Sequence, residues 1–129
     1  MQTHKILLVD DEPDILEVIK MSLQQCIFPL TVESCHDGRQ ALEKFRQNPA
    51  SYSLILTDIR MPNLNGFQLA NEAKKIRPDI PVLFMTAFMI DENMQGYPPT
   101  LSKERIISKP HDILKLCGIM EKELATVAE

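Results

Sequence analysis

Five short apolar runs alternate with segments of helical periodicity along nearly the whole chain, and this alternation limits the possible folds more than any other feature. The runs cover residues 5–9, 30–35, 54–58, 80–85 and 105–108. In the first intervening segment, apolar residues recur at the spacing of one helix face; they are Ile15, Leu16, Ile19 and Leu23. Strands that alternate with helices form a parallel sheet with helices on both faces and right-handed crossovers. The pattern therefore predicts an α/β fold of five strand–helix units.

Turn-forming residues mark the ends of these predicted elements. Pro13 suits the first turn of a helix, because the N–H that proline lacks would have no partner there. Asp37-Gly38 and Asn65-Gly66 turn the chain before two further helices. Residues 30–35 alternate polar with apolar side chains, which predicts a strand nearer the edge of the sheet.

Polar residues follow four of the five apolar runs. Asp10 and Asp11 follow the first run, Asp58 the third, Thr86 the fourth and Lys109 the fifth. The carboxyl ends of parallel strands lie along one edge, where open α/β sheets bind their ligands. We therefore expect these residues to meet at one site, with Asp58 facing a crevice and water rather than the core.

Three carboxylates in one place repel one another, and a bound cation makes the arrangement favourable. Oxygen ligands without a nearby histidine or thiol indicate a hard ion such as Mg²⁺. One carboxylate can then attack phosphorus, while the ion and Lys109 neutralise charge that develops in the transition state. The hydroxyl of Thr86 can donate a hydrogen bond to a phosphoryl oxygen. The residues favour reversible phosphorylation of an aspartate.

Four fragments, in this order and at these spacings, together resemble the receiver domain of two-component response regulators. They are LVDDE at 8–12, DIRMP at 58–62 with Gly66 downstream, PVLFMTA at 81–87 and SKP at 108–110. The resemblance covers roughly residues 5–124, and we expect one receiver domain over residues 1–129. It implies a flavodoxin-like three-layer (βα)5 sandwich with the strand order 2-1-3-4-5.

The same resemblance implies the roles of the acidic residues. Asp58 would be the phosphoacceptor. Asp11, Asp58 and the backbone carbonyl of Arg60 would hold Mg²⁺ or Mn²⁺, and Asp10 would act through a bound water. The phosphoryl donor would be a sensor histidine kinase or a phosphotransfer protein.

The resemblance also assigns the residues that respond to phosphorylation. Lys109 would pair with Asp58 and then with the phosphoryl group, and Thr86 would swing inward to bond it beside Ala87. Pro110 is the candidate for a cis peptide bond. The family commonly has an aromatic switch residue at the position of Ile106. Isoleucine has no ring, so we do not expect phosphorylation to change the domain through the movement of a ring at this position.

The segment of the predicted fourth helix departs from the family pattern. Gly96, Pro98 and Pro99 stand within its body, where each proline would cost about 3 kcal/mol and glycine about 1 kcal/mol. We expect a short, displaced or disordered helix over residues 89–104. Tyr97 is a candidate for an alternative aromatic switch or for a packing residue.

Three functions are compatible with these residues. The first is a signalling module that phosphorylates itself from phosphodonors, loses the phosphoryl group by its own hydrolysis, and changes its partner-binding surface. The second is a pseudo-receiver that binds partners without phosphorylation, which the intact acidic set disfavours. The third is a phosphatase or phosphotransferase with an aspartyl intermediate, and the chain lacks the cap and the second acid that such enzymes carry near their nucleophile.

Composition limits the partners and the compartment. A net charge of −4 and a pI near 5.4 offer no general attraction for nucleic acids or anionic membranes. There is neither an apolar run of about 20 residues nor a secretory h-region near the start. Cys26, Cys35 and Cys117 are widely spaced, and we expect all three to be buried and reduced. The sequence predicts a cytoplasmic protein with an unknown downstream target and a possible phosphorylation-dependent homodimer.

Overall fold

The computed structural model describes residues 4–26, 29–86, 96–97, 106–108 and 113–127. Its elements are β1 (His4–Val9), α1 (Pro13–Leu23), β2 (Leu30–Cys35), α2 (Gly38–Gln47), the short 3-10 helix η1 (Pro49–Ser51), β3 (Leu54–Asp58), α3 (Gly66–Ile76), β4 (Val82–Thr86), β5 (Ile106–Ser108) and α4 (Ile113–Val127). Among them, no helix has both the length and the apolar character needed to cross a bilayer.

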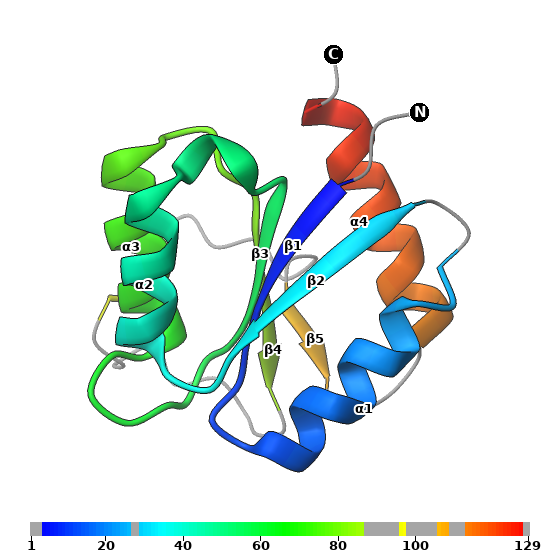
Figure 1. Cartoon of the computed structure of the whole chain (residues 1–129), viewed down its shortest axis with the longest axis horizontal. Coiled ribbons are helices and arrows are strands. Elements are labelled where there is room, and N and C mark those ends of the chain that lie inside the picture. Colours follow the sequence, from blue (N-terminus) through cyan, green and yellow to red (C-terminus); the bar gives the residue numbers. More distant parts are fainter. Residues whose placement is uncertain (1–3, 27–28, 87–95, 98–105, 109–112, 128–129) are drawn as a thin grey trace.

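Within the described residues, five parallel strands form one sheet in the order β2-β1-β3-β4-β5. Helices α2 and α3 cover one face of this sheet, and α1 and α4 cover the other (Figure 1). The predicted three-layer α/β fold is confirmed, as is the strand order that the resemblance implies. β2 lies at an edge, as the alternation of residues 30–35 predicts.

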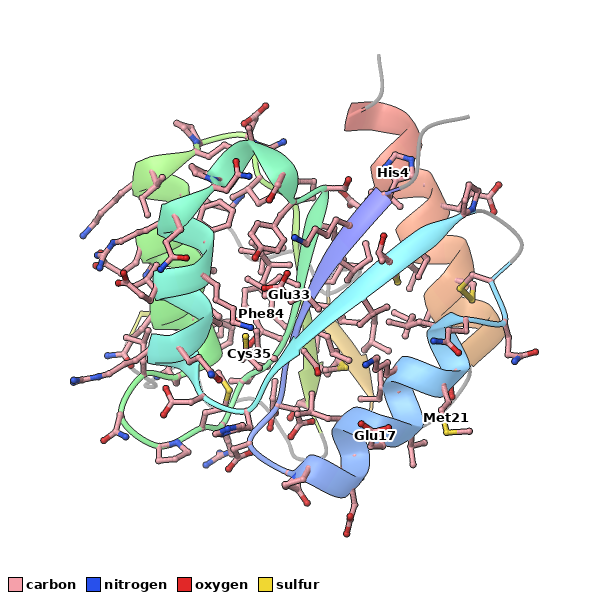
Figure 2. The ribbon with its side chains drawn as sticks, in the orientation of Figure 1. His4, Glu17, Met21, Glu33, Cys35 and Phe84 are labelled. Atoms are coloured by element: carbon pink, nitrogen blue, oxygen red, sulfur yellow. A yellow bond between two sulfur atoms is a disulfide. The ribbon has the colours of Figure 1, made fainter. Side chains whose placement is uncertain are left out.

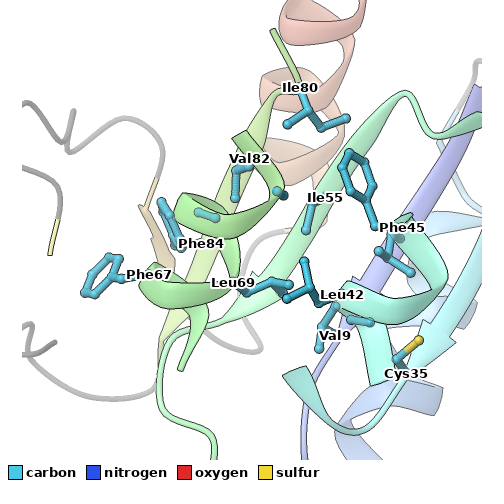
Figure 3. Packing of buried hydrophobic residues seen from close by; sticks show 14 of the residues in the cluster. Val9, Cys35, Leu42, Phe45, Ile55, Phe67, Leu69, Ile80, Val82 and Phe84 are labelled. Atoms are coloured by element: carbon cyan, nitrogen blue, oxygen red, sulfur yellow. The ribbon is translucent and has the colours of Figure 1, made fainter. Parts of the chain in front are cut away.

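Each face of the sheet carries its own hydrophobic core. Leu7 and Val9 of β1 belong to the core beneath α2 and α3 (Figure 3), whereas Ile6 and Leu8 belong to the core beneath α1 and α4. Every residue of β3 and β4 is buried. A strand that is covered on both faces needs apolar side chains at consecutive positions, which explains the continuous runs in the sequence.

The helices begin at the residues that the sequence indicates. Pro13 is the first residue of α1. The side chain of Asp37 caps α2 by accepting a hydrogen bond from the backbone N–H of Arg39 at 2.7 Å. Asn65 and Gln68 form a capping box at the start of α3, with both reciprocal hydrogen bonds at 2.9 Å. These caps fix where the loops on the carboxyl edge of the sheet return into helices.

The cap at Asp37 leads to a first testable prediction. Asp37→Ala should lower the free energy of unfolding by about 1 kcal/mol, because it leaves backbone N–H groups of the first turn of α2 without their acceptor. Urea denaturation measures the change. Glu43→Ala is the control, since it removes an exposed acid from the same helix and no cap. Equal losses in the two variants would show that the charge matters and the cap does not.

The segment predicted to hold the fourth helix, residues 89–104, lies outside the described residues except for Gly96 and Tyr97. Gly96 has a φ of 84°, and its carbonyl oxygen accepts a hydrogen bond from Asn71 of α3 at 3.0 Å. The ring of Tyr97 lies edge-on to Phe67, with 5.2 Å between ring centroids. Tyr97 therefore packs against the core beneath α3, and its role as a switch stays a prediction.

The prediction for two of the cysteines is wrong. Cys26, just after α1, and Cys117, on α4, form a disulfide with 5.6 Å between their Cα atoms. Cys35 is buried and reduced, as predicted. The two bonded residues are 91 positions apart, and nothing local in the sequence shows that the helices bring them together.

Candidate functional site

The strands β1, β3 and β4 end at one level, and this alignment brings the predicted residues together. In the sheet register Val9 lies opposite Thr57, so Asp10 and Asp58 leave neighbouring strands side by side. The ladder continues beyond the strands, because the N–H of Asp10 donates to the carbonyl of Cys35 at 3.1 Å. These backbone bonds give the carboxyl edge of the sheet a defined shape.

Four acidic residues form a cluster at this edge. Asp10, Asp11, Glu12 and Asp58 each offer a carboxylate oxygen, and these oxygens all lie within 4.8 Å of one another. Asp10 is fully buried and Asp58 is only 5% exposed, whereas Asp11 is half-buried and Glu12 is exposed. The expected meeting of the three aspartates is confirmed. The expectation that Asp58 faces water is wrong, since its side chain lies almost wholly inside the fold.

Glu12 is the member of the cluster that the sequence reasoning did not assign. Its backbone N–H donates to Oδ1 of Asp10 at 2.9 Å, which closes the turn between β1 and α1. This turn brings the carboxylate of Glu12 back beside those of the two aspartates. The only signal in the sequence is that Glu12 directly follows Asp11.

The chemistry of this cluster fits a hard divalent cation. The donors are carboxylate oxygens, which Mg²⁺ and Ca²⁺ prefer, and no histidine or thiol belongs to the cluster among the described residues. Close carboxylates repel one another, and burial at Asp10 and Asp58 strengthens that repulsion by excluding water. A cation that binds here would relieve the repulsion, and Asp11 and Glu12 are the more exposed members of the cluster.

A cleft opens beside the cluster, formed with the loop that follows β3. It has a volume of about 380 Å³ and is lined by Asp11, Arg60, Met61, Pro62 and Asn65. Asp11 and Arg60, two of the residues that the resemblance assigns to the metal, thus share one cleft. Its size leaves room for a small anionic group next to the carboxylates.

Gly66 holds this loop against the end of β3. Its N–H donates to the carbonyl of Ile59 at 2.8 Å. A Cβ atom at position 66 would overlap the carbonyl oxygen of Asp58 and would lie 3.0 Å from Cα of Ile59. Asn63, at φ 71°, makes the left-handed bend within the loop. The backbone of Asp58 is therefore placed by a contact that only glycine allows.

The predicted switch residues are described only in part. Thr86 ends β4 and is 9% exposed, and Ser108 of β5 lies opposite it in the register. Lys109 comes one residue after Ser108, and it lies outside the described residues together with Ala87 and Pro110. Ile106, which replaces the expected aromatic residue, is half-buried and packs against the core beneath α2 and α3.

Fold and site together define a doubly wound α/β protein with an acidic cluster at the carboxyl edge of its sheet. Residues 6–121 match the family model of the response regulator receiver domain. The chain therefore belongs to the receiver domain family of two-component response regulators, and it is a signalling module. The match covers β1 from Ile6 onward, the four other strands and the acidic cluster.

Individual relatives agree with this assignment. The chain is 32% identical to the response regulator receiver protein CpdR of Brucella abortus, over 93% of this chain and 96% of CpdR. It is 33% identical to the regulatory protein VanRB of Enterococcus faecalis, over 92% of this chain but only 56% of that longer protein. A crystal structure of a receiver domain protein from Clostridium thermocellum superimposes with a TM-score of 0.80, at 26% identity and 97% coverage of both chains.

Proposed function

We propose that this domain accepts a phosphoryl group on Asp58 from a phosphohistidine of a sensor histidine kinase or a phosphotransfer protein. The observation that carries the proposal is the cluster of four carboxylates, which is buried at Asp58 and Asp10 and open at Asp11 and Glu12. The cleft beside it, lined in part by Asp11 and Arg60, leaves room for a phosphodonor next to the cluster. An aspartate carboxylate can act as the nucleophile toward phosphorus and form an aspartyl phosphate.

In the proposed reaction a carboxylate oxygen of Asp58 attacks the phosphorus atom. The phosphorus–nitrogen bond of the donor breaks, and the released imidazole takes up a proton. Asp11, Asp58 and the backbone carbonyl of Arg60 would hold Mg²⁺ or Mn²⁺, with Asp10 acting through a water. The ion would supply positive charge to offset the charge on the phosphoryl oxygens.

Thr86 and Lys109 are the residues that we propose to respond. Thr86 stands at the end of β4 beside the strand of Asp58, where its hydroxyl can donate to a phosphoryl oxygen. Lys109 follows β5 and would neutralise a second oxygen, while Ala87 and Pro110 flank these two residues. These movements at the carboxyl edge of the sheet would change the surface that binds a downstream protein or a second copy of the chain. We propose that this signalling takes place in the cytoplasm.

Incubation with a small phosphodonor tests the proposal. With acetyl phosphate and Mg²⁺, intact-mass spectrometry should show the mass of one added phosphoryl group, on the peptide that contains Asp58. Chelation of the divalent ion should prevent the addition, and the group should be lost on standing through hydrolysis by the domain itself. Unchanged protein mass over hours in the presence of Mg²⁺ would reject phosphoacceptance and leave the pseudo-receiver interpretation.

The metal ligands give a second testable prediction. Asp11→Asn should weaken Mg²⁺ binding by more than about tenfold, since it removes one charge from a cluster whose repulsion the ion relieves. Isothermal titration calorimetry measures it directly, which suits a chain that contains no tryptophan. Asp14→Asn is the matched control, because Asp14 is exposed in the first turn of α1 and does not belong to the cluster. Equal weakening by both variants would indicate a general charge effect and not a ligand.

A further inference from the structure

The disulfide between Cys26 and Cys117 joins the two helices that cover one face of the sheet. Cys26 lies three residues after the end of α1, and Cys117 lies in the second turn of α4. Both residues are half-buried and neither lies in the interior of the fold. The bond closes a chain segment of 91 residues, which includes most of the fold.

The positions of the two cysteines are set by core packing on either side of the bond. The N–H of Cys26 donates to the carbonyl of Leu23 at 3.1 Å, and Leu23 is fully buried. On α4, Leu116 precedes Cys117 and Met120 comes three residues after it; they are 3% and 0% exposed. The Cα atoms lie 5.6 Å apart, which is within the usual range for a disulfide. Core packing on both sides therefore places the two Cα atoms at a separation that a disulfide spans.

Cys35 is excluded from this chemistry by the sheet. It belongs to the core beneath α2 and α3 (labelled in Figure 2). Cys26 packs against the core beneath α1 and α4. It is only 1% exposed, and burial raises the pKa of its thiol above the ordinary value. A raised pKa lowers the fraction of thiolate, which is the form that attacks a disulfide. Cys26 and Cys117 therefore differ from Cys35 in both position and reactivity.

We propose that Cys26 and Cys117 form a reversible redox site that covalently links α1 to α4. The thiolate of one cysteine attacks a low-molecular-weight disulfide such as glutathione disulfide and releases one glutathione thiol. The second cysteine then attacks the mixed disulfide and releases the second glutathione thiol. Two protein thiols are oxidised to one disulfide, one small disulfide is reduced to two thiols, and each cysteine proton ends on a released thiol.

Oxidation is expected to stabilise the folded domain. A bond across 91 residues restricts the unfolded chain far more than the folded one, in which the helices are already adjacent. For a domain of this size, the melting temperature of the oxidised protein should exceed that of the reduced protein by about 10 °C. This effect does not depend on Asp58 or on a bound ion, so it can be tested apart from phosphorylation.

The test equilibrates the whole chain in buffers with different ratios of reduced to oxidised glutathione and counts thiols after unfolding. The expected result is one thiol in oxidising buffer, assigned to Cys35 by peptide mass spectrometry, and three in reducing buffer, with full return on reversing the buffer. Cys35→Ala should keep both the bond and the shift in melting temperature. Cys26→Ser and Cys117→Ser should each remove both effects.

Several results would overturn the proposal. Three thiols at every ratio would mean that no bond forms, and a bond that includes Cys35 or a second chain would mean that the pairing differs. A bond that persists in strongly reducing buffer would mean that it is permanent and not a redox site. If both serine variants fail to fold, the Cys35→Ala variant and the unsubstituted chain still decide the question through their thiol counts.

Discussion

Asp58→Asn is expected to abolish phosphoryl transfer to the domain while leaving its fold intact. Asparagine has nearly the same shape as aspartate, so it fits a site where the residue is only 5% exposed. Its neutral amide lacks the charged oxygen that attacks phosphorus. Incorporation of phosphate from acetyl phosphate should fall to the background level, as measured by intact-mass spectrometry at a fixed time. Circular dichroism should show unchanged helix and strand content.

Two controls sharpen this experiment. Asp14→Asn makes the same chemical change at an exposed position outside the acidic cluster, and phosphorylation should proceed normally. Asp10→Asn removes a fully buried member of the cluster that is not the acceptor. It should slow phosphorylation without changing which peptide is modified. Continued labelling of the Asp58→Asn variant, on any peptide, would show that the acceptor has been misassigned.

Gly66→Ala is expected to lower the free energy of unfolding more than any other substitution that adds one methyl group at this site. The new Cβ would overlap the carbonyl oxygen of Asp58, and neither backbone segment can move without breaking the hydrogen bond from Gly66 to Ile59. Forced overlap of this kind costs about 1–3 kcal/mol and occasionally more. We expect a loss near the upper end, about 3 kcal/mol, in urea denaturation. Phosphorylation should slow as well, because the backbone of Asp58 must shift.

The chain provides a matched control for this substitution. Gly118 lies exposed within α4, and a Cβ built there meets no atom within 4 Å. Gly118→Ala should stabilise the protein by about 0.5–1 kcal/mol, since alanine favours the helix and restricts the unfolded chain. Opposite signs for the two glycine substitutions would support the contact at Asp58. A neutral Gly66→Ala would mean that the loop after β3 adapts and does not place the acceptor.

The site could be located from the sequence because its residues follow strands. Once β1 and β3 are neighbours, Asp10 and Asp58 must leave the sheet side by side. Periodicity alone did not supply this neighbour relation, since a run of apolar residues carries no information about which strand it pairs with. The strand order came from the resemblance of four fragments to receiver domains. The structure then confirmed it.

The depth of the site could not be predicted in the same way. A carboxylate at a strand end is expected to face water, yet Asp58 is only 5% exposed. The loop after β3 returns and places Gly66 against the backbone of Asp58. That return depends on Asn63 in the left-handed region and on the capping box at Asn65. Each feature is visible in the sequence as a turn signal. The packing of the loop against the backbone of Asp58 is not.

Outside the site, the contacts of Glu33 on β2 also could not be predicted from the sequence. Glu33 contacts Lys5 of β1 at 2.9 Å and Lys44 of α2 at 3.4 Å, and it accepts a hydrogen bond from the hydroxyl of Tyr52 at 3.0 Å. These partners come from three other parts of the chain. In sequence each is an ordinary surface charge or an isolated aromatic residue, so their meeting could not be foreseen.

The sequence by itself determined the strands, the helices, their caps and the polar residues at the strand ends, because hydrophobic period and turn chemistry act over a few neighbouring residues. Only the tertiary structure decided how deeply Asp58 is buried, that Glu12 joins the acidic cluster, and that Cys26 meets Cys117. Each of these depends on the position at which one element packs against another. Such positions are set by side-chain fit across the whole core, and no local pattern encodes them.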